Sequence, residues 1–143
     1  MAKTGEWKPA FQYIIDKFYE AVSLRDFTFH DEGLKTFLLA WLNLTNLYDV
    51  ISEKEKNKGY SDICLEPDRR FIQYVKFDYI IELKYIKAIE IETAVKEEVA
   101  INMAVQIATA QLLQYADNNN FKTIKIIIVT SAKKLLYMDY LSD

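Results

Sequence analysis

The stretch GYSDICLEPDRRFIQYVKFDYIIELKY, residues 59–85, decides the fold. It contains two runs rich in β-branched and aromatic residues, 61–66 and 77–85, and such runs predict strands. The first run ends at Pro67, and the short connection that follows predicts a hairpin. Residues 71–75 are expected to extend this hairpin with further strand residues. The centre of the chain is therefore expected to be a pair of neighbouring strands.

Both expected strands carry an acid, Asp62 in the first and Glu82 in the second, and Lys84 follows Glu82 by two residues. Side chains alternate along a strand, so Glu82 and Lys84 share a face. A hairpin brings Asp62 beside Glu82, where the carboxylates repel and raise each other's pKa unless a cation joins them. Such oxygen ligands suit Mg²⁺ or Mn²⁺. The alternative is a surface ion pair between Glu82 and Lys84, worth at most about 1 kcal/mol.

The rest of the chain predicts helices and strands that enclose this hairpin. Apolar residues at three- and four-residue spacing indicate helices, and β-branched runs indicate strands. The expected elements are helices over residues 8–23, 31–47 and 93–116, and strands over 47–56, 123–131 and 135–141. A helical crossover after a hairpin gives a mixed sheet. We therefore expect an α/β fold with a mixed central β-sheet flanked by α-helices.

Length and composition limit the class of protein. The 143 residues suit one domain, and a hydrophobic content of 51% indicates a globular chain. Cys64 is the only cysteine, which excludes an internal disulfide and a multi-cysteine zinc site and fits a cytoplasmic location. The longest aliphatic run, 126–129, is too short to cross a membrane. A net charge of −3 gives no bulk attraction to nucleic acid.

Three motifs taken together, GYSDICLEPD, DYIIELKY and AQLLQYA, resemble the PD-(D/E)XK nuclease superfamily, which has the restriction-endonuclease-like fold. The resemblance covers roughly residues 31–129 and is closest to bacterial domains found C-terminal to AAA-ATPase-like regions. It implies one domain over residues 1–143, with 1–30 as an N-terminal helical extension and 31–143 as the core. The proline that often precedes the family's aspartate is replaced by Ser61.

The family's D…(D/E)-x-K signature falls on Asp62, Glu82 and Lys84. The resemblance implies that Asp62 and Glu82 hold Mg²⁺ or Mn²⁺, with the backbone carbonyl of Leu83 as a further ligand. Such an ion polarises a phosphodiester and activates a water molecule. Lys84 is then expected to orient that water or to stabilise negative charge in the transition state.

Two supporting residues follow from the same resemblance. Glu32, in HDEGLKTFLL, matches an acid that binds a second metal ion directly or through water; the alternative is an ordinary acid in the first turn of a helix. Gln111, in the Q-x-x-x-Y pattern of AQLLQYA, is expected to position Lys84 or the nucleophile. Gln106 and Gln114 are alternatives for this role, and Gln111 itself has the alternative of a polar residue at the rim of an amphipathic helix.

The function implied is a metal-dependent nuclease that hydrolyses DNA or RNA. The alternative is a weak or inactive nuclease-fold module that serves binding or assembly within a larger ATPase-bearing protein. The chain has no G-x-x-x-x-G-K-[ST] loop, so an ATPase domain is a partner rather than part of it. A homodimer is a further expected partner arrangement. Candidate phosphate-binding residues, interleaved with acids, are Lys54, Lys56, Lys58, Arg69, Arg70, Lys76 and Lys87.

Overall fold

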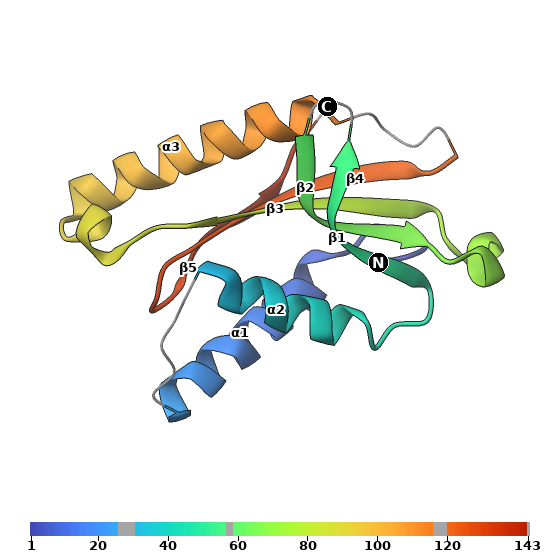
Figure 1. Cartoon of the computed structure of the whole chain (residues 1–143), viewed down its shortest axis with the longest axis horizontal. Coiled ribbons are helices and arrows are strands. Elements are labelled where there is room, and N and C mark those ends of the chain that lie inside the picture. Colours follow the sequence, from blue (N-terminus) through green and yellow to red (C-terminus); the bar gives the residue numbers. More distant parts are fainter. Residues whose placement is uncertain (26–30, 57–58, 116–119, 143) are drawn as a thin grey trace.

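The computed structural model describes residues 1–25, 31–56, 59–115 and 120–142. One five-stranded sheet lies between two helical layers (Figure 1). Helices α1 (Lys8–Arg25) and α2 (Asp31–Leu42) cover one face, and α3 (Ala94–Leu113) covers the other. The expected α/β fold with a mixed central sheet is confirmed. In the described part of the chain, no helix is long and apolar enough to cross a bilayer.

The strands lie in the order β1-β2-β3-β4-β5. Their bounds are β1 Tyr48–Lys56, β2 Gly59–Pro67, β3 Phe77–Tyr85, β4 Lys122–Thr130 and β5 Leu135–Tyr140. Strand β3 runs parallel to β4, and every other neighbouring pair is antiparallel. Helix α3 supplies the crossover that a parallel pair requires. Strand β5, which the sequence predicts as a strand, forms an edge of the sheet.

Two expected elements differ in the structure. Helix α2 ends at Leu42, short of residue 47, and the Asn43 side-chain amide donates to the Leu39 carbonyl at 2.7 Å where the chain turns. The expectation that 71–75 continues a strand is wrong. A 3-10 helix, η1 (Arg69–Tyr74), lies there instead, because the Asp68 carboxylate accepts from the Arg70 amide at 2.9 Å and caps this helix.

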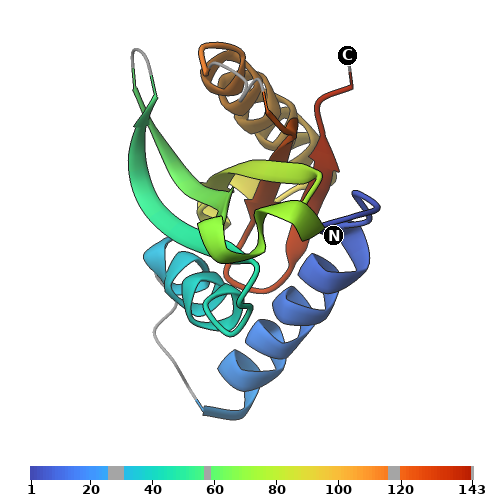
Figure 2. The same cartoon turned by 90° about the vertical axis from the view of Figure 1, so that its right-hand side faces the viewer.

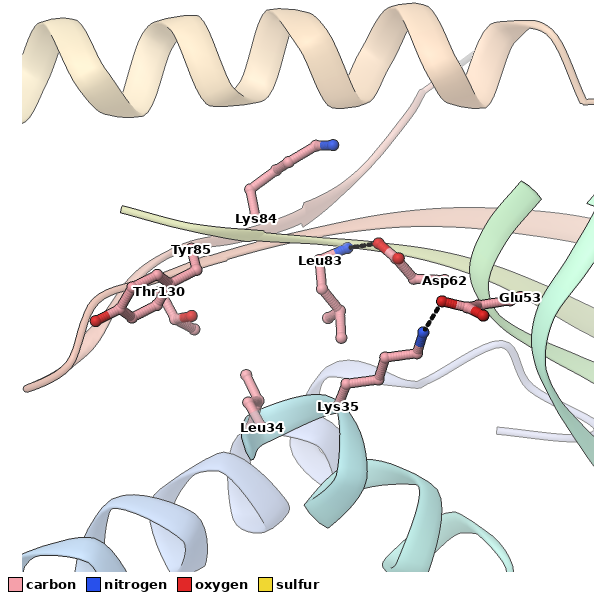
Figure 3. Close-up of a pocket in the computed structure, with 8 residues that line it drawn as sticks. All are labelled: Leu34, Lys35, Glu53, Asp62, Leu83, Lys84, Tyr85 and Thr130. Carbon is pink, nitrogen blue, oxygen red and sulfur yellow. Dashed lines mark hydrogen bonds and ion pairs between the residues drawn. The ribbon is translucent and has the colours of Figure 1, made fainter. Parts of the chain in front are cut away.

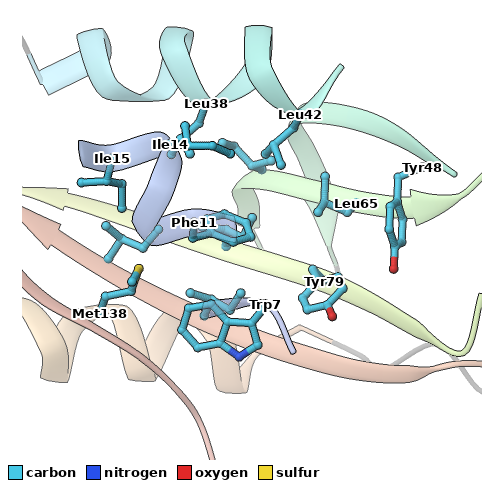
Figure 4. Close-up of a cluster of buried hydrophobic side chains, with 14 of the residues drawn as sticks. Trp7, Phe11, Ile14, Ile15, Leu38, Leu42, Tyr48, Leu65, Tyr79 and Met138 are labelled. Carbon is cyan, nitrogen blue, oxygen red and sulfur yellow. The ribbon is translucent and has the colours of Figure 1, made fainter. Parts of the chain in front are cut away.

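The larger core lies between the sheet and the α1–α2 layer (Figure 4). Phe11 and Ile15 from α1, Leu38 from α2, and Ile81 and Ile128 from the sheet are all fully buried. Burying a side chain of this size stabilises a protein by roughly 1.5–3 kcal/mol relative to leaving it exposed. Helix α1 therefore shares one core with α2 and the sheet.

The smaller core lies under α3, where Ala108 and Leu112 are fully buried against the sheet. Ala94 and Val95, in the first turn of α3, are apolar but exposed, so they do not face this core. Val95 begins a series of apolar residues that recur at every fourth position, and helical geometry places such residues on one side of the helix. This stripe consists of Val95, Val99, Met103 and Ile107, each more than half exposed.

The β1–β2 hairpin separates from the rest of the sheet (Figure 2). Strands β1 and β2 pair along almost their whole length, from Tyr48 opposite Pro67 to Lys56 opposite Gly59. By contrast, β2 pairs with β3 only over Ile63–Leu65. Beyond Ile63 the two strands diverge, and this point of divergence positions the candidate site.

Candidate active site

Asp62 and Glu82 meet where β2 leaves β3. Ile63 pairs with Ile81, so the next opposed residues along the two strands are these two acids. The ladder stops here, and the Leu83 amide donates instead to Oδ2 of Asp62 at 2.8 Å (Figure 3). The two carboxyl groups interact directly, since the charge of Asp62 and a hydrogen bond with its carboxyl group both raise the pKa of Glu82. The hairpin therefore brings both acids to one place.

Glu82 is a buried carboxyl group, with only 2% of its surface exposed. The pKa of Glu82 is raised from 4.5 to about 7. Burial is the main cause, and the charge of Asp62 and a hydrogen bond with the Asp62 carboxyl group also contribute to this rise. A hydrogen bond from Tyr115 and the charge of Lys84 lower this pKa. Because Glu82 is buried, the alternative of a surface ion pair on a solvated strand is wrong.

Lys84 lies on the same face of β3 as Glu82, toward α3 (Figure 3). Its ammonium group donates to Oε1 of Gln111 at 2.6 Å. The two alternatives to this glutamine, Gln106 on α3 and Gln114 just beyond its C-terminal end, are both exposed. The structure thus brings Gln111 to the lysine of the signature.

Tyr115 is a site residue that is not predicted from the sequence. Its hydroxyl donates to Oε1 of Glu82 at 3.0 Å. Burial, followed by the charge of Glu82, raises the pKa of Tyr115, so the phenol stays protonated and remains a donor. The signal was present in the Q-x-x-x-Y pattern, because residues four apart lie on one face of a helix. Gln111 therefore contacts the lysine of the E-x-K triplet, and Tyr115 contacts its glutamate.

Residues 30–140 match the sequence profile of the PD-(D/E)XK nuclease superfamily. The chain belongs to this superfamily. Its mixed five-stranded sheet with flanking helices is consistent with the restriction-endonuclease-like fold. No curated protein and no solved structure matches the chain. The superfamily match leaves α1 outside its limits, although α1 packs into the same core as the matched region.

PD-(D/E)XK nucleases typically use divalent metal ions. The residues at the seam, the place where β2 stops pairing with β3 next to Asp62 and Glu82, fit such an ion. Asp62 and Glu82 offer carboxylate oxygens that already repel each other. In an extended strand the N–H and C=O of one residue point to the same side, so the Leu83 carbonyl faces the same gap as its amide. The described residues hold no cluster of three potential metal-binding side chains. Two carboxylates suffice for Mg²⁺, which retains several waters.

The remaining candidate residues fall in two groups. The backbone of Glu32 lies in the first turn of α2, but its side chain is outside the described residues. The same holds for the side chains of Lys54 and Lys56, and Lys58 as a whole is outside the description.

The other expected phosphate contacts lie mostly at the far end of the sheet. Arg69 and Arg70 belong to η1, and Lys76 immediately precedes β3, whereas the site lies at the opposite end of that strand. At about 3.3 Å per residue, Lys76 is roughly 20 Å along the strand from Glu82. Arg70 is also paired with Asp68 at 2.7 Å. Only Lys87 lies just beyond the end of β3 that carries the site.

Proposed function

We propose that this chain is a Mg²⁺- or Mn²⁺-dependent phosphodiesterase that hydrolyses DNA, with RNA as the second substrate. The observation that carries the proposal is the pairing of Asp62 and Glu82 at the seam between β2 and β3, with Lys84 next to them on β3. Superfamily membership supports a nucleic-acid substrate. The charge of the whole chain gives no such support, so substrate contacts have to come from local groups.

Each residue then has a task in the hydrolysis. A bound divalent ion supplies Lewis-acid polarisation of the phosphodiester and lowers the pKa of a water molecule. Asp62 and Glu82 hold the ion, and the Leu83 amide keeps Asp62 in position. Lys84 donates to the phosphate as negative charge develops there, and Gln111 holds its ammonium group in place. Water attacks phosphorus and gives up a proton to the solvent, one P–O ester bond breaks, and the leaving oxygen takes a proton from the solvent.

The raised pKa of Glu82 links metal binding to pH. A hydrogen bond between the two carboxyl groups requires a proton on one of them. A divalent ion binds the deprotonated ligands, so binding has to release this proton. Affinity is therefore expected to rise with pH up to about 7 and to level off above it.

A second candidate function is a nuclease-fold module that serves binding or assembly and hydrolyses its ligand slowly or not at all. The burial of Glu82 favours it, because a carboxyl group with 2% of its surface exposed and a Tyr115 hydrogen bond is less open to an ion and substrate. Homodimerisation, an ATPase-bearing partner and a cytoplasmic location remain predictions from the sequence.

Cleavage of supercoiled plasmid, single-stranded DNA and RNA with Mg²⁺ or Mn²⁺ tests the proposal. We expect Asp62→Asn and Lys84→Ala to lower activity by two orders of magnitude or more, on the order of a lost transition-state interaction. Glu98→Gln on the exposed side of α3 is the matched control and is expected to retain activity. Activity that survives Lys84→Ala would come from another source. A melting temperature raised by Mg²⁺ without cleavage would favour the binding module.

A further inference from the structure

A cavity of about 320 Å³ opens beside the seam on the α2 side of β3 (Figure 3). Asp62, Leu83 and Glu53 of β1 line it, and Lys35 of α2 extends toward Glu53 from the helical side. Lys84 points away from α2 toward α3, where Gln111 holds it. Among the described residues, Lys35 is thus a lysine that faces the site from the α2 side.

Lys35 and Glu53 form an asymmetric ion pair. The Lys35 ammonium lies 3.2 Å from Oε1 of Glu53, yet the lysine side chain is 16% exposed while the glutamate side chain is 71% exposed. An exposed carboxylate keeps most of its hydration, so it is a weak partner. Replacing the Glu53 carboxylate by another anion as the partner of Lys35 is therefore expected to cost little free energy.

The backbone of Glu53 is unusual at the same place. Among the residues that the structure describes, it is the one non-glycine residue with a positive φ, 52°. The β1–β2 register passes from Ser52 opposite Ile63 to Lys54 opposite Ser61, which leaves Glu53 opposite Asp62 with the ladder interrupted. Left-handed backbone is unfavourable for a residue with a Cβ, and such strain gathers at functional sites. Glu53, the strained residue, thus lies beside Asp62, the proposed metal ligand, and its carboxylate is the counter-ion of Lys35.

We propose that Lys35 binds a backbone phosphate next to the scissile phosphodiester, and that Glu53 is the counter-ion it releases. The proposal rests on the proposed function, since it assigns a substrate contact to the same site. The ligand is a nucleic-acid phosphodiester, because a lysine side chain that is only 16% exposed and lies beside a divalent-ion site suits an anion that spans both. Lys35 contacts substrate but takes no part in bond breaking, so it acts on KM and leaves kcat near the wild-type value.

Binding of a fluorescein-labelled single-stranded oligonucleotide, measured by anisotropy with Ca²⁺ in place of Mg²⁺, tests this subsite. Lys35→Gln is expected to raise Kd about fivefold to tenfold and to lower the slope of log Kd against log salt by about one. Lys35→Arg keeps the charge and is expected to restore most of the affinity. Lys17→Gln, which removes an exposed lysine of α1 paired with Glu20, is the matched control and should change little.

Glu53→Gln provides a second test, because it removes the charge that pairs with Lys35 and leaves a side chain of similar size at the position with positive φ. We expect it to lower Kd about twofold to fivefold, and the double variant with Lys35→Gln to bind like Lys35→Gln alone. A Lys35→Gln protein with wild-type Kd and salt slope would overturn the subsite. A Glu53→Gln gain that persists without Lys35 would also overturn it.

The same measurements separate this proposal from the proposed function. Normal cleavage with no effect of Lys35→Gln on Kd or KM would remove the subsite and leave the nuclease. Oligonucleotide binding that depends on Lys35, with no cleavage under any metal condition, would support the subsite and remove the hydrolytic activity. A wild-type protein that binds no oligonucleotide would overturn both.

Discussion

Glu82→Gln is expected to stabilise the metal-free protein at neutral and alkaline pH. The pKa of Glu82 is about 7 in the folded protein and 4.5 by default. At about 1.4 kcal/mol for each pKa unit, this shift corresponds to about 3 kcal/mol. Because the folded-state pKa is the higher one, the protonated carboxyl stabilises the fold fully below about pH 4.5, and this stability is lost as pH rises through 7. Glutamine never ionises, so the variant avoids this loss.

Urea unfolding between about pH 4 and pH 8, in buffer with a chelator, measures the effect. The free energy of unfolding of Glu82→Gln relative to wild type should increase by about 3 kcal/mol across this range. Glutamine keeps an oxygen that accepts from Tyr115, so the comparison isolates the charge. Glu98→Gln, an exposed control on α3, should follow the wild-type curve.

A difference between Glu82→Gln and wild type that stays flat with pH would refute the reasoning. It would mean that Glu82 is hydrated when ionised, and that burial does not disfavour its charged form. Saturating Mg²⁺ provides a further check. It should remove the loss of stability in the wild type above pH 7 and leave the variant unchanged, because the ion stabilises only the carboxylate.

Three further predictions concern the same layer of the structure. Asp62→Asn removes a neighbouring negative charge, so the pKa of Glu82 should fall below about 7, seen as an unfolding pH profile whose midpoint moves to lower pH. Tyr115→Phe removes a hydrogen bond that favours the carboxylate, so the same pKa should rise and the Mg²⁺-induced increase in melting temperature at pH 7 should shrink; an unchanged shift would show that Tyr115 does not support the site. Leu112→Ala should destabilise the fold by about 2–5 kcal/mol in urea unfolding, whereas the exposed control Val95→Ala should stay within about 0.5 kcal/mol of wild type.

The sequence was sufficient for the faces of the central strands. Period-two alternation in DYIIELKY places Ile80, Glu82 and Lys84 on one side of β3, and the α3-side core confirms Ile80 there. The bounds expected for this strand, 77–85, agree with the structure because the run is long and rich in β-branched and aromatic residues. The apolar pattern of α3 does not show which of its sides is buried, since an exposed apolar stripe resembles a buried one in sequence.

The contact between Lys35 and Glu53 could not be expected from the sequence. The residues are 18 positions apart and lie in different elements, so no local period links them. A positive φ is usually foreseen at Gly, Asn or Asp, and a glutamate inside a strand gives no such signal. Only the fold shows that this residue stands opposite Asp62.

The site depends on an interruption in the sheet that has a structural cost. If β2 continued to pair with β3 past Ile63, the Leu83 amide would donate to a backbone carbonyl, and the Asp62 carboxylate would be free to turn away from the strand gap. The interruption leaves that amide for Asp62, and the side chain replaces the missing ladder bond at 2.8 Å. The same acid is thereby fixed beside Glu82, and its charge adds to the burial that raises the pKa of Glu82. The divergence of the strands thus makes room for an ion and also orients one of its ligands, so closing the gap would remove both together.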